Sequence, residues 1–223
     1  MYDIVFISYN ETDADKNYAA LKYQFPMAKR VHGVKGIHQA HIKAAKKCFT
    51  KMFWVVDADA KIVKGFNFDY VVPDHQLDHV HVWRSINPIN GLEYGYGGVK
   101  LLPRMLTVNM DVSKTDMTTS ISNNFKAMSD IANITAFNTD EFSTWRSAFR
   151  ECAKLASRTI SGQINEETEE RLKVWTTKAE GKFSRYALRG ANAGMEFGNT
   201  NGNDLELINN FDWLKEQFDA AGI

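Results

Sequence analysis

VHGVKGIHQAHIKAAKKCFTKMFWVVDADAKIVK, residues 31–64, contains the clearest succession of secondary-structure signals in the chain. A turn carrying Gly33 and Gly36 comes first, residues 38–48 follow with small and apolar side chains at helical spacing, and residues 51–56 form an apolar run. Apolar residues that recur every three to four positions predict an amphipathic helix, and a short apolar run between polar segments predicts a buried strand. We therefore expect this stretch to fold as a turn, a helix and a strand.

Two carboxylates follow that strand directly, in Asp57-Ala58-Asp59. Hard cations such as Mg²⁺ and Mn²⁺ prefer oxygen ligands, often one or two carboxylates together with substrate phosphates. Side chains two residues apart in an extended strand share one face. If the strand continues to Asp59, both carboxylates face one site, or one reaches a metal and the other a ribose. The alternative is a pair of solvated loop acids.

The segments before this stretch complete an alternating pattern. Residues 3–8 predict a strand, a helix then runs to about residue 25, and residues 28–34 predict a second strand. Strand, helix, strand, helix, strand with short links is typical of a parallel sheet covered by helices. Ligands gather at the carboxyl ends of such strands. The polar clusters at residues 9–11, 33–36 and 57–59 are therefore expected to converge.

The second half of the chain predicts further elements of the same α/β class. We expect strands at residues 79–86 and 131–137, a Gly-rich loop that runs into another strand within residues 94–102, helices at 138–158, 165–178 and 209–220, and a mobile Gly- and Asn-rich loop at 187–204. We find no internal repeat and no linker between folding units. The expected architecture is one domain, residues 1–223, with a mixed, mostly parallel sheet flanked by helices. Its two halves would be residues 1–105 and residues 106–223.

Composition excludes several classes of protein. The 223 residues are 44% hydrophobic, and 27 basic residues balance 27 acidic ones, so the formal net charge is zero. A strongly basic nucleic-acid-binding domain is therefore not expected, although a local basic groove is compatible. Cys48 and Cys152 are too far apart for a metal-ligand pair and do not suggest a disulfide framework. With no signal-like leader and no bilayer-length apolar run, we expect a soluble cytoplasmic protein without a membrane partner.

Residues 32–62 resemble the nucleotide-binding half of GT-A glycosyltransferases, in which a Gly-bearing turn, an Ala-rich helix and a strand ending in Asp-x-Asp follow in this order. Ser8–Glu11 (SYNE) resembles the family's nucleotide-contacting loop. Residues 97–104 resemble the segment before the acceptor site, and residues 139–142 resemble the acidic pair that opens the catalytic-base helix. The likeness covers roughly residues 2–155. The chain also resembles short glycosyltransferase-like proteins of tailed phages, some of which add sugars to hydroxymethylated DNA bases.

The resemblance implies an enzyme that uses Mn²⁺ or Mg²⁺ to move a sugar from a nucleotide donor, UDP by preference, to a hydroxyl. The acceptor would be 5-hydroxymethylcytosine in phage DNA, and the protein would work in the host cytoplasm. The nucleotide sugar would bind in residues 1–105 and the acceptor in residues 106–223. The predicted site residues are Asp57 and Asp59 for metal; Ser8, Tyr9, Asn10, Glu11, Lys35, His38, Asp57, Arg185 and Arg189 for the donor; Gly97, Gly98, Lys100 and Trp145 for the acceptor; and Asp140, ahead of Glu141, as general base.

Each assignment has a simpler alternative. All six His lie at or before residue 81, so the third metal ligand that many family members take from a later His would be water, His79, His81 or Asn192. Asn138 and Glu141 have the spacing of a helix capping box, which would explain the acidic pair without catalysis. The remaining candidates have structural alternatives too: His38 as a half-buried helix residue, Lys100 as a solvated rim, and Arg185 and Arg189 on a surface loop.

Two other functional classes share these features. A nucleotidyltransferase uses carboxylates and a metal on a similar sheet, and a non-catalytic module would bind a nucleotide sugar to regulate a partner. A run of basic residues would suit phosphate contacts with DNA or a solvated helix face: Lys29, Arg30, Lys43, Lys46, Lys47 and Lys51.

Overall fold

The computed structural model describes residues 1–95, 97–158 and 164–222, without the side chains of residues 202 and 203. Its contacts divide the chain into two compact units. The sheet unit comprises Met1–Ile86 and Glu93–Ala136, and the helical unit comprises Asn87–Leu92 and Phe137–Ile223. The predicted single domain, with halves that meet at residue 105, stays a prediction.

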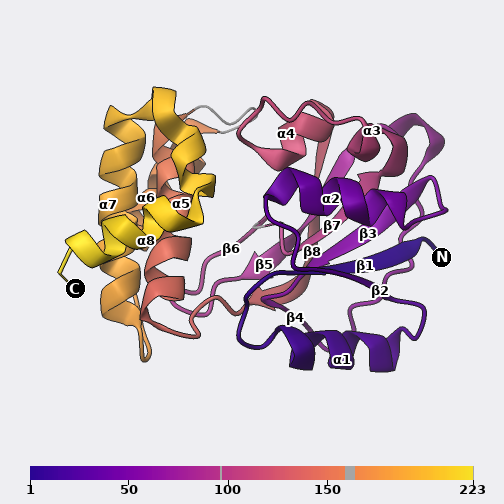
Figure 1. Cartoon of the computed structure of the whole chain (residues 1–223), viewed down its shortest axis with the longest axis horizontal. Helices are drawn as coiled ribbons and strands as arrows, with labels where there is room; N and C mark the ends of the chain where they lie inside the picture. Colours follow the sequence, from indigo (N-terminus) through magenta and orange to yellow (C-terminus); the bar gives the residue numbers. More distant parts are fainter. Residues whose placement is uncertain (96, 159–163, 223) are drawn as a thin grey trace. The chain divides into compact units, whose positions relative to one another are not determined.

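The sheet unit is built on one mixed β-sheet with the strand order β2-β1-β3-β7-β5-β8-β4, to which β6 adds by pairing with β5 (Figure 1). β1 runs parallel to β2 and β3, β5 runs parallel to β8, and β7 is antiparallel to β3 and β5. The predicted α/β class, with a mixed sheet flanked by helices, is confirmed. The strands are β1 (Asp3–Ser8), β2 (Lys29–His32), β3 (Met52–Asp57), β4 (Ala60–Ile62), β5 (Val80–Ile86), β6 (Glu93–Tyr94), β7 (Val99–Pro103) and β8 (Phe125–Thr135).

Helices cover both faces of this sheet (Figure 1). On one face, Leu21 of α1 packs in a core with Phe6 and Trp54. On the other face, Ala44 of α2 packs in a second core with Val55. The helices of the unit are α1 (Ala14–Gln24), α2 (Ile37–Lys46), α3 (Arg104–Val108), α4 (Met117–Ile121) and a short 3₁₀ helix, η1 (Asp74–Gln76).

The order of the first three strands creates a topological switch point. From β1 the chain passes through α1 to β2 on one side, and then through α2 to β3 on the other side of β1. The connection that leaves β1 leads to β2 on one side, and the connection that leaves β3 leads to β4 at the opposite end of the sheet, so the two connections diverge at the carboxyl ends of β1 and β3. Ile7 pairs there with Asp57. Ligands of open α/β sheets bind at such switch points.

The helical unit contains α5 (Glu141–Ser157), α6 (Asn165–Thr177), α7 (Ser184–Thr200), the 3₁₀ segment η2 (Gly202–Asn209) and α8 (Phe211–Ala220). Trp145 and Phe149 of α5 form its core with Leu214 of α8. α7 approaches α5 very closely, because a Cβ atom added at Gly190 or Gly194 would overlap a backbone carbonyl oxygen of α5. Glycine is therefore required where these two helices meet.

Most predicted elements are confirmed, and one is wrong. The strand at residues 3–8 has the expected bounds, and the other predicted strands and helices are present with shifted ends. The mobile loop expected at residues 187–204 is wrong, because residues 184–200 form α7. The short elements β4, β6, α3 and α4 were not predicted. None of the helices in the described residues combines the length and apolar character that a bilayer crossing needs.

Candidate functional site

The carboxyl end of β1 brings the first predicted donor-binding residues to the switch point. Ser8 is buried, and its Oγ accepts a hydrogen bond from Arg30 Nε at 2.9 Å and lies 3.0 Å from His32 Nδ1. Tyr9 and Asn10 are exposed just beyond it. Glu11 closes the turn by accepting a hydrogen bond from the Tyr9 backbone N–H at 2.7 Å. The structure thus holds Ser8 in place and leaves Tyr9 and Asn10 accessible.

Asp57, the last residue of β3, has a buried lysine as its charge partner. Lys100 Nζ donates to both carboxylate oxygens of Asp57, at 2.9 and 2.8 Å, and its third hydrogen bond goes to the carbonyl of Gly97. The Lys100 side chain is 4% exposed, whereas the Asp57 side chain is 35% exposed. One face of the carboxylate therefore contacts the ammonium, and part of the carboxylate remains open to solvent.

The Gly97-Gly98 turn completes this arrangement. The Asp57 backbone N–H donates to the Gly98 carbonyl at 2.9 Å, which extends the β3–β7 pairing to the end of the strand. Gly97 has a φ of +78°, a conformation that glycine adopts readily. A Cβ at Gly98 would lie 2.6 Å from Nδ2 of buried Asn133. Both glycines thus serve to bring Lys100 and Asp57 together, a role that sequence reasoning did not assign to them.

The second acid, Asp59, does not continue the strand. Extended structure ends at Asp57, and Ala58-Asp59 forms a turn into β4. The Asn17 side chain holds this turn by donating to the Ala58 carbonyl at 2.8 Å, and Ala136 N–H donates to the Asp59 carbonyl at 2.7 Å. The condition under which both carboxylates share one strand face is therefore not met.

The residues do not fit a divalent ion held by both carboxylates. A cation bound to Asp57 would lie close to the Lys100 ammonium, and two unit charges about 4 Å apart repel by about 4 kcal/mol at an effective dielectric constant near 20. A divalent ion doubles that repulsion. Within the described residues, no three His, Cys, Asp or Glu side chains are grouped as metal ligands. The Mn²⁺ or Mg²⁺ requirement stays a prediction from the resemblance.

The residues considered for a third ligand have protein partners of their own. His79 Nδ1 lies 2.7 Å from an Asp78 oxygen, and His81 is fully buried with Nδ1 3.1 Å from the His79 carbonyl. These histidines lie where β5 begins, toward the sheet edge opposite the carboxyl end of β3. Asn192 belongs to the helical unit, where it donates to the Leu188 carbonyl at 2.8 Å.

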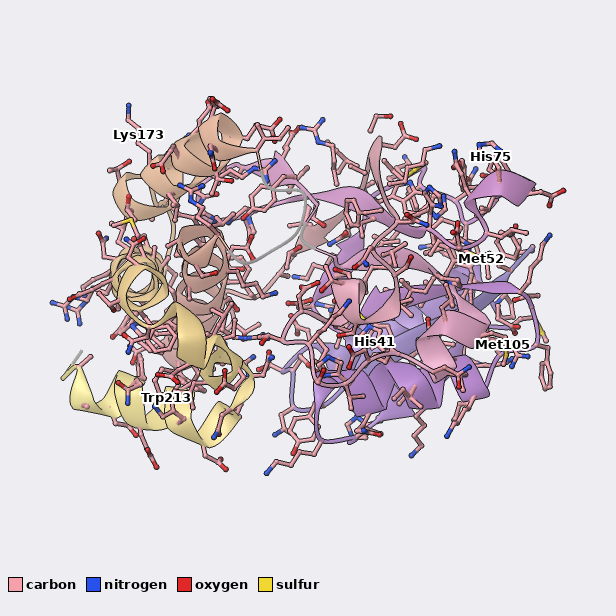
Figure 2. The ribbon with its side chains drawn as sticks, turned by 90° about the horizontal axis from the view of Figure 1, so that it is seen from above. His41, Met52, His75, Met105, Lys173 and Trp213 are labelled. Carbon is pink, nitrogen blue, oxygen red and sulfur yellow. The ribbon has the colours of Figure 1, made fainter. Side chains whose placement is uncertain are left out.

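His41, labelled in Figure 2, is a second buried group of the sheet unit, and the charge of Lys100 acts on it. Its Nδ1 lies 2.8 Å from the Ile37 carbonyl, which can only accept, so Nδ1 carries the proton. Nε2 is then a bare acceptor, with no hydrogen-bond partner among the described residues. Burial, with the Lys100 ammonium adding to it, lowers the pKa of His41 to about 3. His41 is therefore neutral, and Lys100 carries the positive charge beside Asp57.

Two buried histidines make the stability of the sheet unit depend on pH. The pKa of His41 is lowered to about 3 and that of His81 to about 4, in both cases chiefly by burial. Because an unfolded histidine has a pKa near 6.5, the unfolded chain takes up protons below that pH that the folded chain does not. Stability is thus fully present above pH 6.5 and falls as the pH drops toward 4. We expect each histidine to lower the free energy of unfolding by up to ~1.4 kcal/mol per pH unit there.

Denaturant titrations at pH 7, 6 and 5 measure this slope. His41→Leu should remove about half of it, whereas His75→Gln, a change at an exposed histidine, should leave it intact. An unchanged slope in His41→Leu would contradict a neutral His41.

The predicted phosphate-contact residues of the Gly33–Gly36 turn have different surroundings. Lys35 is exposed in the turn. His38 is half-buried, and its Nε2 lies 3.0 Å from Ser120 Oγ. A half-buried helix residue was the alternative considered for His38, and this contact agrees with it.

Several members of the basic run have acidic partners. Lys29 pairs with Asp3 at 2.6 Å and Arg30 with Asp15 at 2.6 Å. Lys51 lies 3.4 Å from an Asp74 oxygen. The contact of Arg30 with Ser8 also ties it to the end of β1. These side chains therefore have structural roles in addition to any contact with phosphate.

The acidic pair proposed as general base opens α5 in the helical unit. Asp140 is the N-cap residue, and its carboxylate accepts hydrogen bonds at 2.7 Å from both the backbone N–H and the Oγ of Ser143. The alternative of a capping box from Asn138 is therefore wrong. Burial alone would raise the pKa of Asp140, but these bonds and one from Thr139 hold it below its ordinary value. Glu141 is exposed and accepts from the Tyr186 hydroxyl at 2.6 Å.

The remaining predicted residues of the helical unit are surface or core residues. Arg185 and Arg189 are exposed on α7, and the Arg185 guanidinium lies 5.2 Å from the Tyr186 ring centre. Trp145 is 2% exposed and stacks on Phe149 with ring centres 4.9 Å apart. Trp145 therefore packs in the core of this unit. Its burial does not support direct contact with an acceptor, and that contact stays a prediction.

A separate hollow of about 680 Å³ lies at the amino-terminal edge of β3, away from Asp57. It is lined by apolar and charged side chains that include Phe49, Lys51, His75 and Met105. His75 and Met105 are labelled in Figure 2. We place the candidate site at the carboxyl edge instead, because the buried ion pair and the switch point coincide there.

No protein-family model matches the chain, and a search of the curated proteins finds no significant match.

Proposed function

We propose that this chain is a glycosyltransferase that transfers a sugar from a nucleotide donor, preferably a UDP-sugar, to a hydroxyl acceptor. The sheet unit would bind the nucleotide at the carboxyl ends of β1 and β3. Tyr9, Asn10 and the open part of the Asp57 carboxylate are the groups available there for the base and ribose, and Ser8 and Glu11 hold that loop in place. Lys35, in the neighbouring turn, is an exposed cation available for phosphate.

The observation that carries this proposal is the buried Asp57–Lys100 pair at the switch point. A buried ion pair is weak evidence for stability, because apolar side chains of similar volume often stabilise a fold as well or better. A pair of this kind at the place where α/β proteins bind ligands, with its carboxylate partly open, is therefore better explained by recognition. A carboxylate fixed by a lysine is a good hydrogen-bond acceptor for ribose hydroxyls.

A panel of ligands tests the nucleotide site. We expect UDP and UDP-sugars to raise the melting temperature of the protein, because a ligand that binds only the folded state stabilises it by mass action. Asp57→Asn should abolish the shift, and Glu93→Gln, at an exposed residue of β6, should retain it. Stabilisation by nucleoside triphosphates alone, with pyrophosphate release, would instead indicate a nucleotidyltransferase. Binding without transfer to any acceptor would indicate a regulatory module.

For the acceptor, we propose DNA that carries hydroxymethylated cytosine. The resemblance supports this, together with Lys43 and Lys46, which are exposed on α2. The test is transfer of a radiolabelled sugar to modified and unmodified duplexes at a stated salt concentration. Equal labelling of both duplexes, or of neither when another hydroxyl compound is labelled, would exclude this acceptor.

For the general base, the contacts in the helical unit favour Glu141 over Asp140. Asp140 serves as a helix cap with a lowered pKa, which makes it a weaker proton acceptor. We expect Glu141→Gln to lower kcat by roughly 10²–10⁴-fold without loss of stability, and Asp140→Ala to lower the free energy of unfolding by ~1 kcal/mol. Steady-state kinetics and denaturant unfolding of both variants measure this. Full activity in Glu141→Gln would remove it as the base.

A further inference from the structure

The charge partner of Asp57 is part of the protein itself. All three protons of the Lys100 ammonium have acceptors, namely the two Asp57 oxygens and the Gly97 carbonyl. The side chain is 4% exposed, so the ammonium stays at Asp57 and does not extend into solvent. Neutral His41 adds no second charge nearby. The carboxylate therefore already has the compensating cation that a metal ion would otherwise supply.

We infer that the Lys100 ammonium takes the place of a divalent cation at Asp57, so that the nucleotide binds here without a metal. This inference rests on the proposed function for its ligand, but the cation assignment is measurable without any nucleotide. Lys100 then acts as a positioning residue. It orients and neutralises Asp57, whose open part accepts hydrogen bonds from the sugar hydroxyls of the nucleotide. A metal at the open part of this carboxylate would lie close to an ammonium that is fixed by three hydrogen bonds, and the two cations would repel each other.

The first experiment uses the wild-type protein. Isothermal titration with UDP is performed in EDTA and again in about 1 mM Mn²⁺. The two dissociation constants for UDP should lie within roughly twofold of each other. Binding that weakens tenfold or more in EDTA would overturn the inference and still support the proposed function. Absence of UDP binding in both buffers would count against the proposed function, and the metal titration below then decides the inference alone.

The second experiment follows Mn²⁺ directly by electron paramagnetic resonance, without nucleotide. The wild type should bind no Mn²⁺ at Asp57. Lys100→Met, which keeps the length of the side chain and removes its charge, should show weak Asp57-dependent Mn²⁺ binding, because a single carboxylate then holds the ion with water as its other ligands. The matched control is Lys100→Met with Asp57→Asn, which should lose that binding again. Mn²⁺ binding by the wild type that disappears in Asp57→Asn would overturn the inference. If Lys100→Met does not fold, the wild-type titrations decide.

Discussion

Replacing Gly194 with alanine is expected to lower the free energy of unfolding of the helical unit by about 3 kcal/mol. The added Cβ would overlap the backbone carbonyl of Phe149, and backbone cannot rotate away as a flexible side chain can. Alanine favours a helix over glycine by ~1 kcal/mol, so the helix propensity of α7 works in the opposite direction. A measured destabilisation would therefore come from the close approach of α5 and α7, reduced by the gain in helix propensity. Chemical denaturation, with hydrogen exchange on peptides of α5 and α7, locates the effect.

Asn199→Ala is the matched control, because Asn199 is exposed on the same helix and the change also raises helix propensity. We expect this variant to be at least as stable as the wild type. Gly190→Ala should behave like Gly194→Ala, since its Cβ would overlap the Trp145 carbonyl. If Gly194→Ala were as stable as Asn199→Ala, the two helices could not be in contact as described.

The same glycines explain why α7 could not be predicted by helix propensity. Glycine and asparagine are poor helix formers, so four glycines among several asparagines indicate a loop. Gly190, Gly194 and Gly198 are spaced by four, however, and small residues at that spacing lie on one face of a helix. Recognising this requires a partner helix, and the partner, α5, lies about 40 residues earlier in the chain. Tertiary packing therefore decided the structure of this segment.

The elements in the first half of the chain were easier to predict, because the residues of each element indicate its secondary structure without reference to a distant partner. The run DIVFIS and the apolar spacing of residues 38–48 each indicate their own secondary structure, and the alternation of these elements implies the parallel strands β1, β2 and β3. The carboxyl edge of β1 and β3 could thus be predicted as the ligand-binding edge.

The ion pair at that edge could not be predicted. Lys100 stands in the apolar run VKLL, and nothing near it in sequence indicates burial or a partner 43 residues away. Lys100 of β7 lies opposite Val55 of β3, and this pairing is set by strand register, which cannot be read from the sequence pattern. The turn at Asp59 also depends on a distant strand pairing, because β4, which follows it directly, pairs with β8 and not with β1 or β3. The pattern Asp-x-Asp therefore identified the right place but not the arrangement of its two acids.

Breaking the ion pair from the acid side should have the second large effect. Asp57→Asn removes the negative charge and leaves the buried Lys100 ammonium with an amide and the Gly97 carbonyl as neutral acceptors. Removing one partner of a buried pair typically lowers stability by 3–5 kcal/mol, because the other charge stays buried without compensation. The Asp57 side chain is one-third exposed, so we expect the lower end, about 3 kcal/mol, measured by urea denaturation of the variant.

The double variant Asp57→Asn with Lys100→Met separates stability from recognition. Without the ammonium no uncompensated charge remains, so stability should return to within about 1 kcal/mol of the wild type, while UDP binding should stay absent because Asp57 is gone. The matched control is Asp74→Asn. It breaks an ion pair in which the side chains of Lys51 and Asp74 are 60% and 94% exposed. An exposed pair contributes little, so this variant should keep the stability of the wild type. A double variant as unstable as Asp57→Asn would show that the loss comes from the strand end itself. In that case the charge on Lys100 would have no part in holding the site.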